Sequence, residues 1–139
     1  MEIEIRDLAW ADVDHGLIRR AARLALSEGG GQVDRLSVAL VDDERIAEIG
    51  RSFRGADGPT DVIAFEAETE LDRTAGEVII SLQTAEKQAG EAGHSLAREA
   101  CLLMAHGVLH VLGYDDENEA GARRMRQMQD RVLDLLGEI

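Results

Sequence analysis

Residues 106–116, HGVLHVLGYDD, combine residue types and a spacing that could bind a metal ion. His106 and His110 are four positions apart, so on a helix their side chains share one face, with Cβ atoms ~5–6 Å apart. Two imidazoles at that separation can hold one metal. Gly113 follows where a helix needs a left-handed residue to end, and a chain that reverses there can bring Asp116 back to the metal. We therefore predict His106, His110 and Asp116 as metal ligands.

The whole spacing, H-x-x-x-H-x-x-G-x-x-D, is that of the metzincin zinc peptidases with aspartate in place of their third histidine. In zinc peptidases the residue after the first histidine is a glutamate that acts as general base. Here that residue is Gly107. The sequence therefore keeps the ligands of a hydrolytic metal site but lacks the peptidase base, which makes a metallopeptidase the weakest of the functions that fit.

Asp116 also has a structural interpretation that competes with metal binding. With Glu119 three residues later it resembles a capping box at the start of a final helix, which it would stabilise by ~1 kcal/mol. As a ligand, a carboxylate oxygen binds zinc at ~2.0–2.2 Å, close to the reach of an imidazole nitrogen. We prefer the ligand interpretation because the predicted turn already returns the chain to the site. Two histidines and one carboxylate suit Zn²⁺ first, and Fe²⁺ or Mn²⁺ as well.

Hydrophobic periodicity places these residues among four strands and five helices. The strands are predicted around Ile3 and Ile5 and at residues 33–41, 60–66 and 76–81, the last with a continuous apolar run typical of a central strand. The helices are predicted at residues 14–28, from Asp42 to about Phe53, from 81 to 90 or 93, at 95–112 and at 117–136. Strands mixed with helices around one sheet indicate an α+β or α/β domain.

Length, cysteine content and the first residues limit the class of protein. The 139 residues suggest one domain, spanning residues 1–139. The single cysteine, Cys101, excludes an internal disulfide and suits a reducing cytosol. The first ten residues carry charges where a signal peptide needs an apolar run, and no stretch approaches the ~20 apolar residues of a membrane span. We therefore expect a cytoplasmic protein with no membrane partner.

The net charge of −13 argues against binding nucleic acid through overall charge, so any RNA contact has to use a local basic patch. Aromatic residues make up only 3% of the chain, so extensive stacking on bases is not expected. Two groups of arginines are best interpreted as solvated helix faces, although either group could contact RNA: Arg19, Arg20 and Arg23, and Arg123, Arg124 and Arg126.

Three segments together resemble one known family. Residues 106–116 resemble H-G-x-L-H-L-x-G-Y-D-H, the signature of the YbeY family of bacterial endoribonucleases and rRNA maturation factors. Residues 53–66, FRGADGPTDVIAFE, look like the family's Y-R-G-x-x-x-P-T-D-V-L-S-F segment, and residues 76–81, GEVIIS, like its G-D-I-x-I-S strand. The resemblance continues through Met125 and the terminal LLG, so it covers most of the chain.

The resemblance implies a fold, a cofactor and a substrate. The fold would be an α+β, metalloprotease-like (zincin-like) domain with a four-stranded mixed sheet packed against about five helices. The cofactor would be a metal, usually taken as zinc, held by three histidines, whose positions here are those of His106, His110 and Asp116. An arginine important for activity falls on Arg54. The partners would be single-stranded RNA of the small ribosomal subunit and small-subunit ribosomal proteins, with no DNA.

Arg54 and Glu99 are the candidate catalytic residues. Arg54 could hold a phosphate near the metal; its alternative is a solvated arginine at a helix end, favoured there by the helix dipole. Glu99 lies seven residues before His106 on nearly the same helix face, where it could orient a ligand or act as a distant base. Its alternative is an ordinary charge near the start of that helix.

The leading hypothesis, which the resemblance implies, is a metal-dependent, single-strand-specific endoribonuclease that acts in 16S rRNA maturation and ribosome quality control. An alternative is a non-catalytic ribosome-assembly factor with a structural metal. Structural zinc sites normally have four protein ligands, whereas three leave a position open for chemistry, which favours the enzyme. A metallopeptidase is the weaker alternative.

Overall fold

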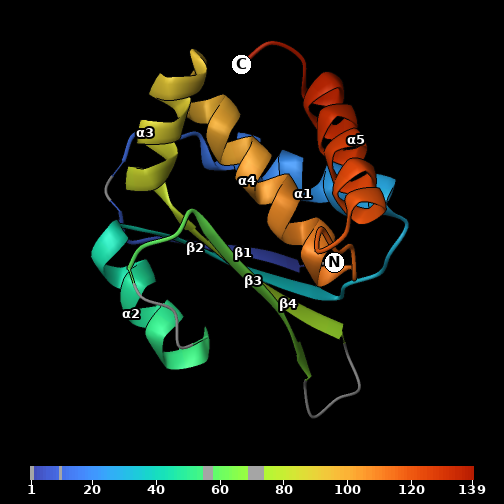
Figure 1. Ribbon diagram of the computed structural model, residues 1–139, viewed down its shortest axis with the longest axis horizontal. Coiled ribbons are helices and arrows are strands. Elements are labelled where there is room, and N and C mark those ends of the chain that lie inside the picture. Colours follow the sequence, from blue (N-terminus) through green and yellow to red (C-terminus); the bar gives the residue numbers. More distant parts are fainter. Residues whose placement is uncertain (1, 10, 55–57, 69–73) are drawn as a thin grey trace.

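The computed structural model describes residues 2–9, 11–54, 58–68 and 74–139. These residues form four strands and five helices, coloured along the chain in Figure 1. In chain order they are β1 (Glu2–Asp7), α1 (His15–Gly29), β2 (Arg35–Val41), α2 (Asp43–Arg54), β3 (Val62–Glu68), β4 (Thr74–Ser81), α3 (Leu82–Ala92), α4 (Leu96–Val111) and α5 (Glu119–Leu136).

The four strands form one mixed sheet in the order β1-β2-β4-β3. β1, β2 and β4 are parallel, with Ile5 opposite Val38 and Val38 opposite Val78. β3 runs antiparallel to β4 and places Ala64 opposite Val78. The predicted four-stranded mixed sheet is confirmed, and so is the central position of the strand that contains residues 76–81.

Helices lie on both faces of this sheet, with more of them on one face than on the other. α1, α3, α4 and α5 lie on one face, and α2 lies on the other (Figure 1). The larger apolar core joins the four helices to inward side chains of the parallel strands, such as Val38 and Val78. The smaller core, formed by Val41, Ile46, Ile63 and Ile79, lies under α2. α4 contacts α1, α3, α5, β3 and β4, which explains why its sequence is apolar nearly all round.

Two glycines bring α4 unusually close to the sheet. A Cβ atom added to Gly107 would lie 2.6 Å from Val78 Cγ1, and one added to Gly76 would lie 2.6 Å from Val111 Cγ1. Neither distance leaves room for a side chain, because interiors are already close-packed. The glutamate that zinc peptidases carry after the first histidine therefore has no space at position 107, where the helix presses on the sheet.

Local capping signals set most helix ends where the sequence predicts them. The side chains of Asp14, Ser81 and Ser95 accept backbone N–H bonds in the first turns of α1, α3 and α4. Gly93, with φ 76°, ends α3 at the later of the two predicted positions. The last helix differs, since it begins at Glu119 and not at residue 117. Among the described residues, no helix is both long and apolar enough to span a bilayer.

Candidate metal centre

The end of α4 reverses the chain as Gly113 predicts. Gly113 adopts φ 97°, a conformation that glycine reaches without a Cβ penalty. The Gly113 N–H donates to the His110 carbonyl at 3.0 Å, and the Tyr114 N–H donates to the Leu109 carbonyl at 2.9 Å. These bonds satisfy the last carbonyls of the helix and turn the following residues back along it. Asp116 thereby returns to the two histidines, although it lies on a different segment.

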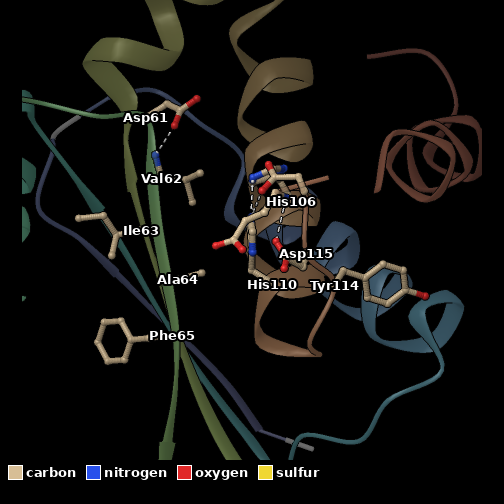
Figure 2. A pocket seen from close by; sticks show the side chains of 11 residues that line it. Asp61, Val62, Ile63, Ala64, Phe65, His106, His110, Tyr114 and Asp115 are labelled. Carbon is tan, nitrogen blue, oxygen red and sulfur yellow. Dashed lines mark hydrogen bonds and ion pairs between the residues drawn. The ribbon is translucent and has the colours of Figure 1, made fainter. Parts of the chain in front are cut away.

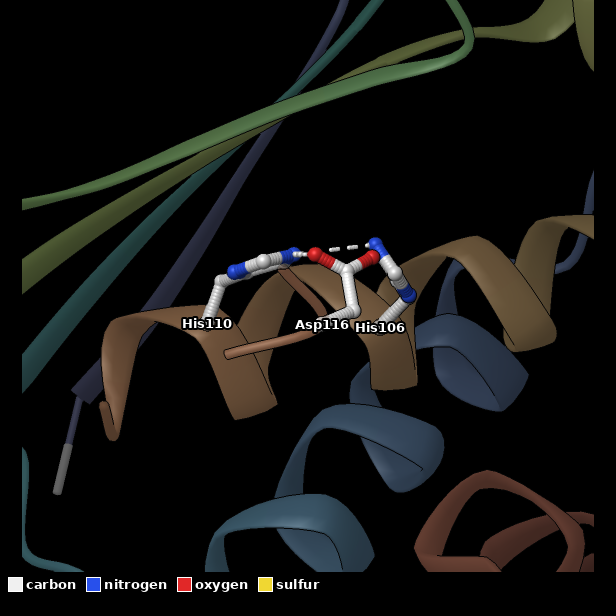
Figure 3. A group of neighbouring side chains, drawn as sticks. All are labelled: His106, His110 and Asp116. Atoms are coloured by element: carbon white, nitrogen blue, oxygen red, sulfur yellow. Dashed lines mark hydrogen bonds and ion pairs between the residues drawn. The ribbon is translucent and has the colours of Figure 1, made fainter. Parts of the chain in front are cut away.

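Three side chains converge beyond this turn. His106 Nε2 and His110 Nε2 lie 3.1 Å apart, and Asp116 Oδ1 lies 3.9 Å from His110 Nε2. One ligand atom from each residue lies within 4.8 Å of the others, and Figure 3 shows the carboxylate between the two rings. A tetrahedral metal with bonds of ~2.0–2.2 Å needs ligand atoms roughly 3.4 Å apart. The nitrogen and oxygen donors therefore fit a zinc-like ion with small side-chain adjustments.

The competing interpretation of Asp116 as a helix cap is wrong. Asn118 is the N-cap of α5, and its Oδ1 accepts from the Gly121 N–H at 2.7 Å. Asp115 Oδ1 accepts from the Glu117 N–H at 2.9 Å, so a second neighbour supports the turn. Because these two residues satisfy the local backbone donors, the Asp116 carboxylate is directed at the histidines instead.

Gly121 fixes the distance between α5 and the turn. A Cβ atom at this position would lie 2.1 Å from the carbonyl oxygen of Asp115, closer than any real contact. The missing side chain lets the first turn of α5 press against the backbone next to Asp116. The sequence analysis missed this glycine, because nothing in the linear order shows which backbone atom it faces.

Gln129 is a second residue that the sequence analysis missed. It lies on α5, is only 9% exposed, and its amide nitrogen is 2.7 Å from Nδ1 of His106. A signal for it does exist in the sequence, since position 129 continues the inward stripe that includes Met125, Val132 and Leu136. A polar side chain on a buried stripe needs a hydrogen-bond partner, and here the partner is a predicted metal ligand.

The surroundings of His106 keep its imidazole neutral. Burial lowers the pKa of His106 most, and the nearby His110 lowers it further. The charges of Asp116 and Asp61 act in the opposite direction but do not cancel the effect. Since only the neutral ring can bind a metal, this environment prepares the ligand at neutral pH.

A cavity of about 790 Å³ opens beside the three candidate ligands. Residues 61–65 form one wall, and His106, His110 and residues 114–117 form the other. In Figure 2, Val62 and Ala64 point toward α4, whereas Ile63 and Phe65 point to the other side of β3. Asp61 at the cavity rim accepts from the Val62 N–H at 2.8 Å and from the Gln88 amide at 3.3 Å. The cavity is large enough for a nucleotide-sized group to reach the histidines.

The structure places Glu99 away from this cavity. Its carboxylate lies 3.2 Å from His94 Nε2, and the side chain is 6% exposed. Seven residues of helix separate Glu99 from His106 by ~10 Å along the axis. The catalytic role of Glu99 stays a prediction, and its pairing with His94 agrees with the alternative of a charge near the helix start.

Arg54 is the last residue of α2, as expected for a residue at a helix end. Its side chain lies outside the described residues, as do residues 55–57 that follow it. The role predicted for Arg54 at the metal therefore stays a prediction.

Comparison with known proteins gives one consistent result. The chain matches the family model described as Endoribonuclease YbeY over residues 6–137. It is 46% identical over 126 residues to the Endoribonuclease YbeY of Pelotomaculum thermopropionicum, covering 85% of this chain and 83% of that one. It is 42% identical over 148 aligned positions to the Endoribonuclease YbeY of Salinispora tropica, covering 96% of this chain and 94% of the relative.

A solved structure shows the same arrangement of elements. The solution structure of the Thermotoga maritima protein TM1509 superposes on this chain with a TM-score of 0.63 at 25% sequence identity. The match covers 95% of this chain and 88% of the Thermotoga maritima chain. The similarity thus extends over nearly the whole chain.

Proposed function

Because the chain belongs to the YbeY family of endoribonucleases, we propose that it is a metal-dependent nuclease that cleaves single-stranded RNA during 16S rRNA maturation and ribosome quality control. Its fold is the zincin-like α+β fold of that family. The observation that supports a hydrolytic metal site is the convergence of His106, His110 and Asp116 within 4.8 Å, beside an open cavity.

We further propose that residues 1–139 act as one hydrolase domain in the cytoplasm. Contacts between α4 and elements from both halves of the chain, α1 and α5 among them, support the single domain. The single-stranded rRNA of the small subunit is the proposed substrate, and small-subunit ribosomal proteins are the proposed partners. Neither DNA nor a membrane is expected to take part.

His106, His110 and Asp116 would hold the metal, with Zn²⁺ as the first choice and Fe²⁺ or Mn²⁺ as alternatives. When bound, the metal supplies Lewis acidity toward a phosphodiester oxygen and toward the attacking oxygen nucleophile. The cavity wall formed by residues 61–65 would position the RNA chain against these ligands. Arg54 would counter the negative charge that develops on the phosphate.

Two other functions receive less support from the geometry. A structural zinc site normally has four protein ligands, whereas the described residues bring together three, next to a cavity. A metallopeptidase needs a base at position 107, where Val78 and Val62 leave no space for a side chain. The arrangement therefore favours phosphodiester hydrolysis over both alternatives.

The proposal is tested with purified protein, a labelled single-stranded RNA and the same RNA annealed into a duplex. We expect the wild type loaded with zinc to cut the single strand and to spare the duplex. His110→Ala should lose both zinc and cleavage, because it removes a ligand. Full cleavage by His110→Ala would contradict the proposal and indicate a contaminating nuclease. Elemental analysis of the wild type beside Asp116→Ala identifies the metal and tests the third ligand.

A further inference from the structure

Gln129 is the only glutamine on the buried face of α5, where its neighbours are Met125, Val132 and Leu136. Burying an amide among apolar side chains is costly unless its polar atoms find partners. The partner of Gln129 is Nδ1 of His106 on α4, at 2.7 Å. This contact joins the two helices at a side chain that belongs to the candidate metal centre.

The two ring nitrogens of His106 have different environments. Nε2 faces the other candidate ligands, 3.1 Å from His110 Nε2, whereas Nδ1 faces Gln129. A histidine that binds a metal through Nε2 must carry its remaining proton on Nδ1. That Nδ1–H then needs an acceptor, and Gln129 is the side chain within hydrogen-bonding distance.

The orientation of the amide in the structure corresponds to the other tautomer. With its nitrogen toward His106, Gln129 donates to Nδ1, so the ring proton sits on Nε2 and points to His110. A half-turn about the last torsion of the side chain exchanges the amide nitrogen and oxygen at nearly the same positions. After that turn the amide oxygen accepts from Nδ1–H, and Nε2 is left free to bind a metal.

We propose that Gln129 is a positioning residue that sets the tautomer of His106 through this reversible hydrogen bond. Without metal the amide donates to Nδ1; with metal it accepts from Nδ1–H, and the ring proton has moved from Nε2 to Nδ1. A glutamine can serve both states because it has a donor and an acceptor at one end. The inference rests on the proposed ligand role of His106.

Two substitutions separate hydrogen bonding from packing. Gln129→Met keeps the length of the side chain but removes the acceptor. Gln129→Glu keeps the acceptor and removes the donor, so it fixes the metal-binding tautomer. Gln127 is exposed on the same helix, and Gln127→Met and Gln127→Glu are the matched controls.

Zinc affinity, measured by competition with a chromophoric chelator, is the first readout. We expect Gln129→Met to bind zinc about 10- to 100-fold more weakly than the wild type, as is usual for loss of a ligand's supporting partner. Gln129→Glu should bind zinc at least as tightly as the wild type. Both Gln127 variants should have the zinc affinity of the wild type. An affinity of Gln129→Met equal to that of the wild type would overturn the inference. So would a loss in Gln129→Glu as large as in Gln129→Met.

The tautomer of His106, observed by imidazole ¹⁵N NMR in the metal-free protein at about pH 7.5, is the second readout. We expect the proton on Nε2 in the wild type and on Nδ1 in Gln129→Glu, and the same tautomer in both would overturn the inference. This experiment uses neither metal nor the Gln129→Met variant, so it still tests the inference if Gln129→Met fails to fold. Zinc affinity unchanged in His106→Ala would instead contradict the proposed ligand set.

Discussion

Two of the three candidate ligands, His106 and Asp116, depend on residues that are not themselves ligands. Gln129 contacts the remote nitrogen of His106, and Gly121 allows the backbone beside Asp116 to approach α5. Asn118 caps α5, so the Asp116 carboxylate is not used for that purpose. Single substitutions at these positions should therefore change the affinity for the metal, although none of these residues is a proposed ligand.

Arg54→Ala should lower the kcat/KM for single-stranded RNA by at least about 10²-fold, the usual effect of removing a charge-stabilising group. Zinc content should stay at the wild-type level, because Arg54 is not among the proposed ligands. Parallel kinetic and elemental analysis measures both quantities. Arg45→Ala, an exposed arginine on the same helix, is the control and should retain activity. Activity of Arg54→Ala close to that of the control would show that Arg54 has no catalytic role.

The metal-free protein should become less stable as the pH falls from about 7 to 5.5, in part because of His106. Burial, and then His110, lower the pKa of His106 in the folded state. In the unfolded chain this ring takes up a proton near pH ~6.5, whereas in the folded state it does so only at lower pH. Above this pH range, protonation of His106 therefore does not change the free energy of unfolding. As the pH falls through the range, the unfolded state gains a proton first, and the free energy of unfolding decreases.

Urea denaturation of the metal-free protein at several pH values measures this dependence. The comparison is His106→Gln, which cannot titrate, and its unfolding free energy should fall less over the same range. Parallel pH profiles for the wild type and His106→Gln would show that the pKa of His106 does not differ between the folded and unfolded states.

At the scale of the elements, the position of α4 decides the site. Gly107 and Gly76 let this helix lie close to β4. The neighbouring strand β3 and the residue just before it, Asp61, supply residues 61–65 of the cavity wall. The two histidines of α4 and residues 114–117 of the turn after it then form the opposite side. These glycines thus set the distance between the helix and the sheet, and that distance determines where the candidate ligands on α4 lie relative to the cavity wall.

Gly121→Ala should weaken zinc binding and lower the free energy of unfolding by about 1–3 kcal/mol, the usual cost of overpacking. The new Cβ would meet the Asp115 carbonyl oxygen, so the turn that carries Asp116 has to move. Gly90→Ala is the control, since no atom lies near a Cβ added to this glycine of α3. That change should leave zinc binding intact and raise stability by ~0.5–1 kcal/mol through helix propensity. Equal zinc affinities for the two variants would contradict the proposed role of Gly121.

At the scale of the whole molecule, a strongly acidic chain has to accommodate RNA. The net charge is −13, and Asp61, Asp115, Asp116 and Glu117 line the cavity. Two arginines of the predicted basic groups, one on α1 and one on α5, make contacts within the protein. Arg20 donates to the Leu135 carbonyl at 3.4 Å, and the Arg124 guanidinium lies 4.6 Å from the centre of the Tyr114 ring. Few phosphate contacts are therefore expected.

Affinity for single-stranded RNA should consequently depend only weakly on salt. One or two phosphate contacts predict less than about a tenfold loss of affinity between roughly 50 and 200 mM monovalent salt. Fluorescence anisotropy measures this change with His110→Ala, which we expect to bind RNA without cutting it. A loss of about 100-fold or more would instead indicate an extended basic surface, and the arginines of α1 and α5 would be the first to replace.

The sequence by itself determined the features that depend on neighbouring residues. The spacing of His106 and His110, the turn at Gly113 and the caps at Asp14, Ser81 and Ser95 follow from helix geometry and backbone hydrogen bonding. The alternation and length of apolar runs likewise predicted the strands and helices to within a few residues.

Only the tertiary structure decided which side chains from distant segments meet. Gln129 is 23 residues from His106, and residues 61–65 are more than 40 residues away from it, yet all border one site. The choice of Asn118 over Asp116 as the cap likewise depends on where Gly121 meets the turn. Close packing between helices and sheet sets these contacts, and it depends on the shapes of surfaces that no local pattern of residues specifies.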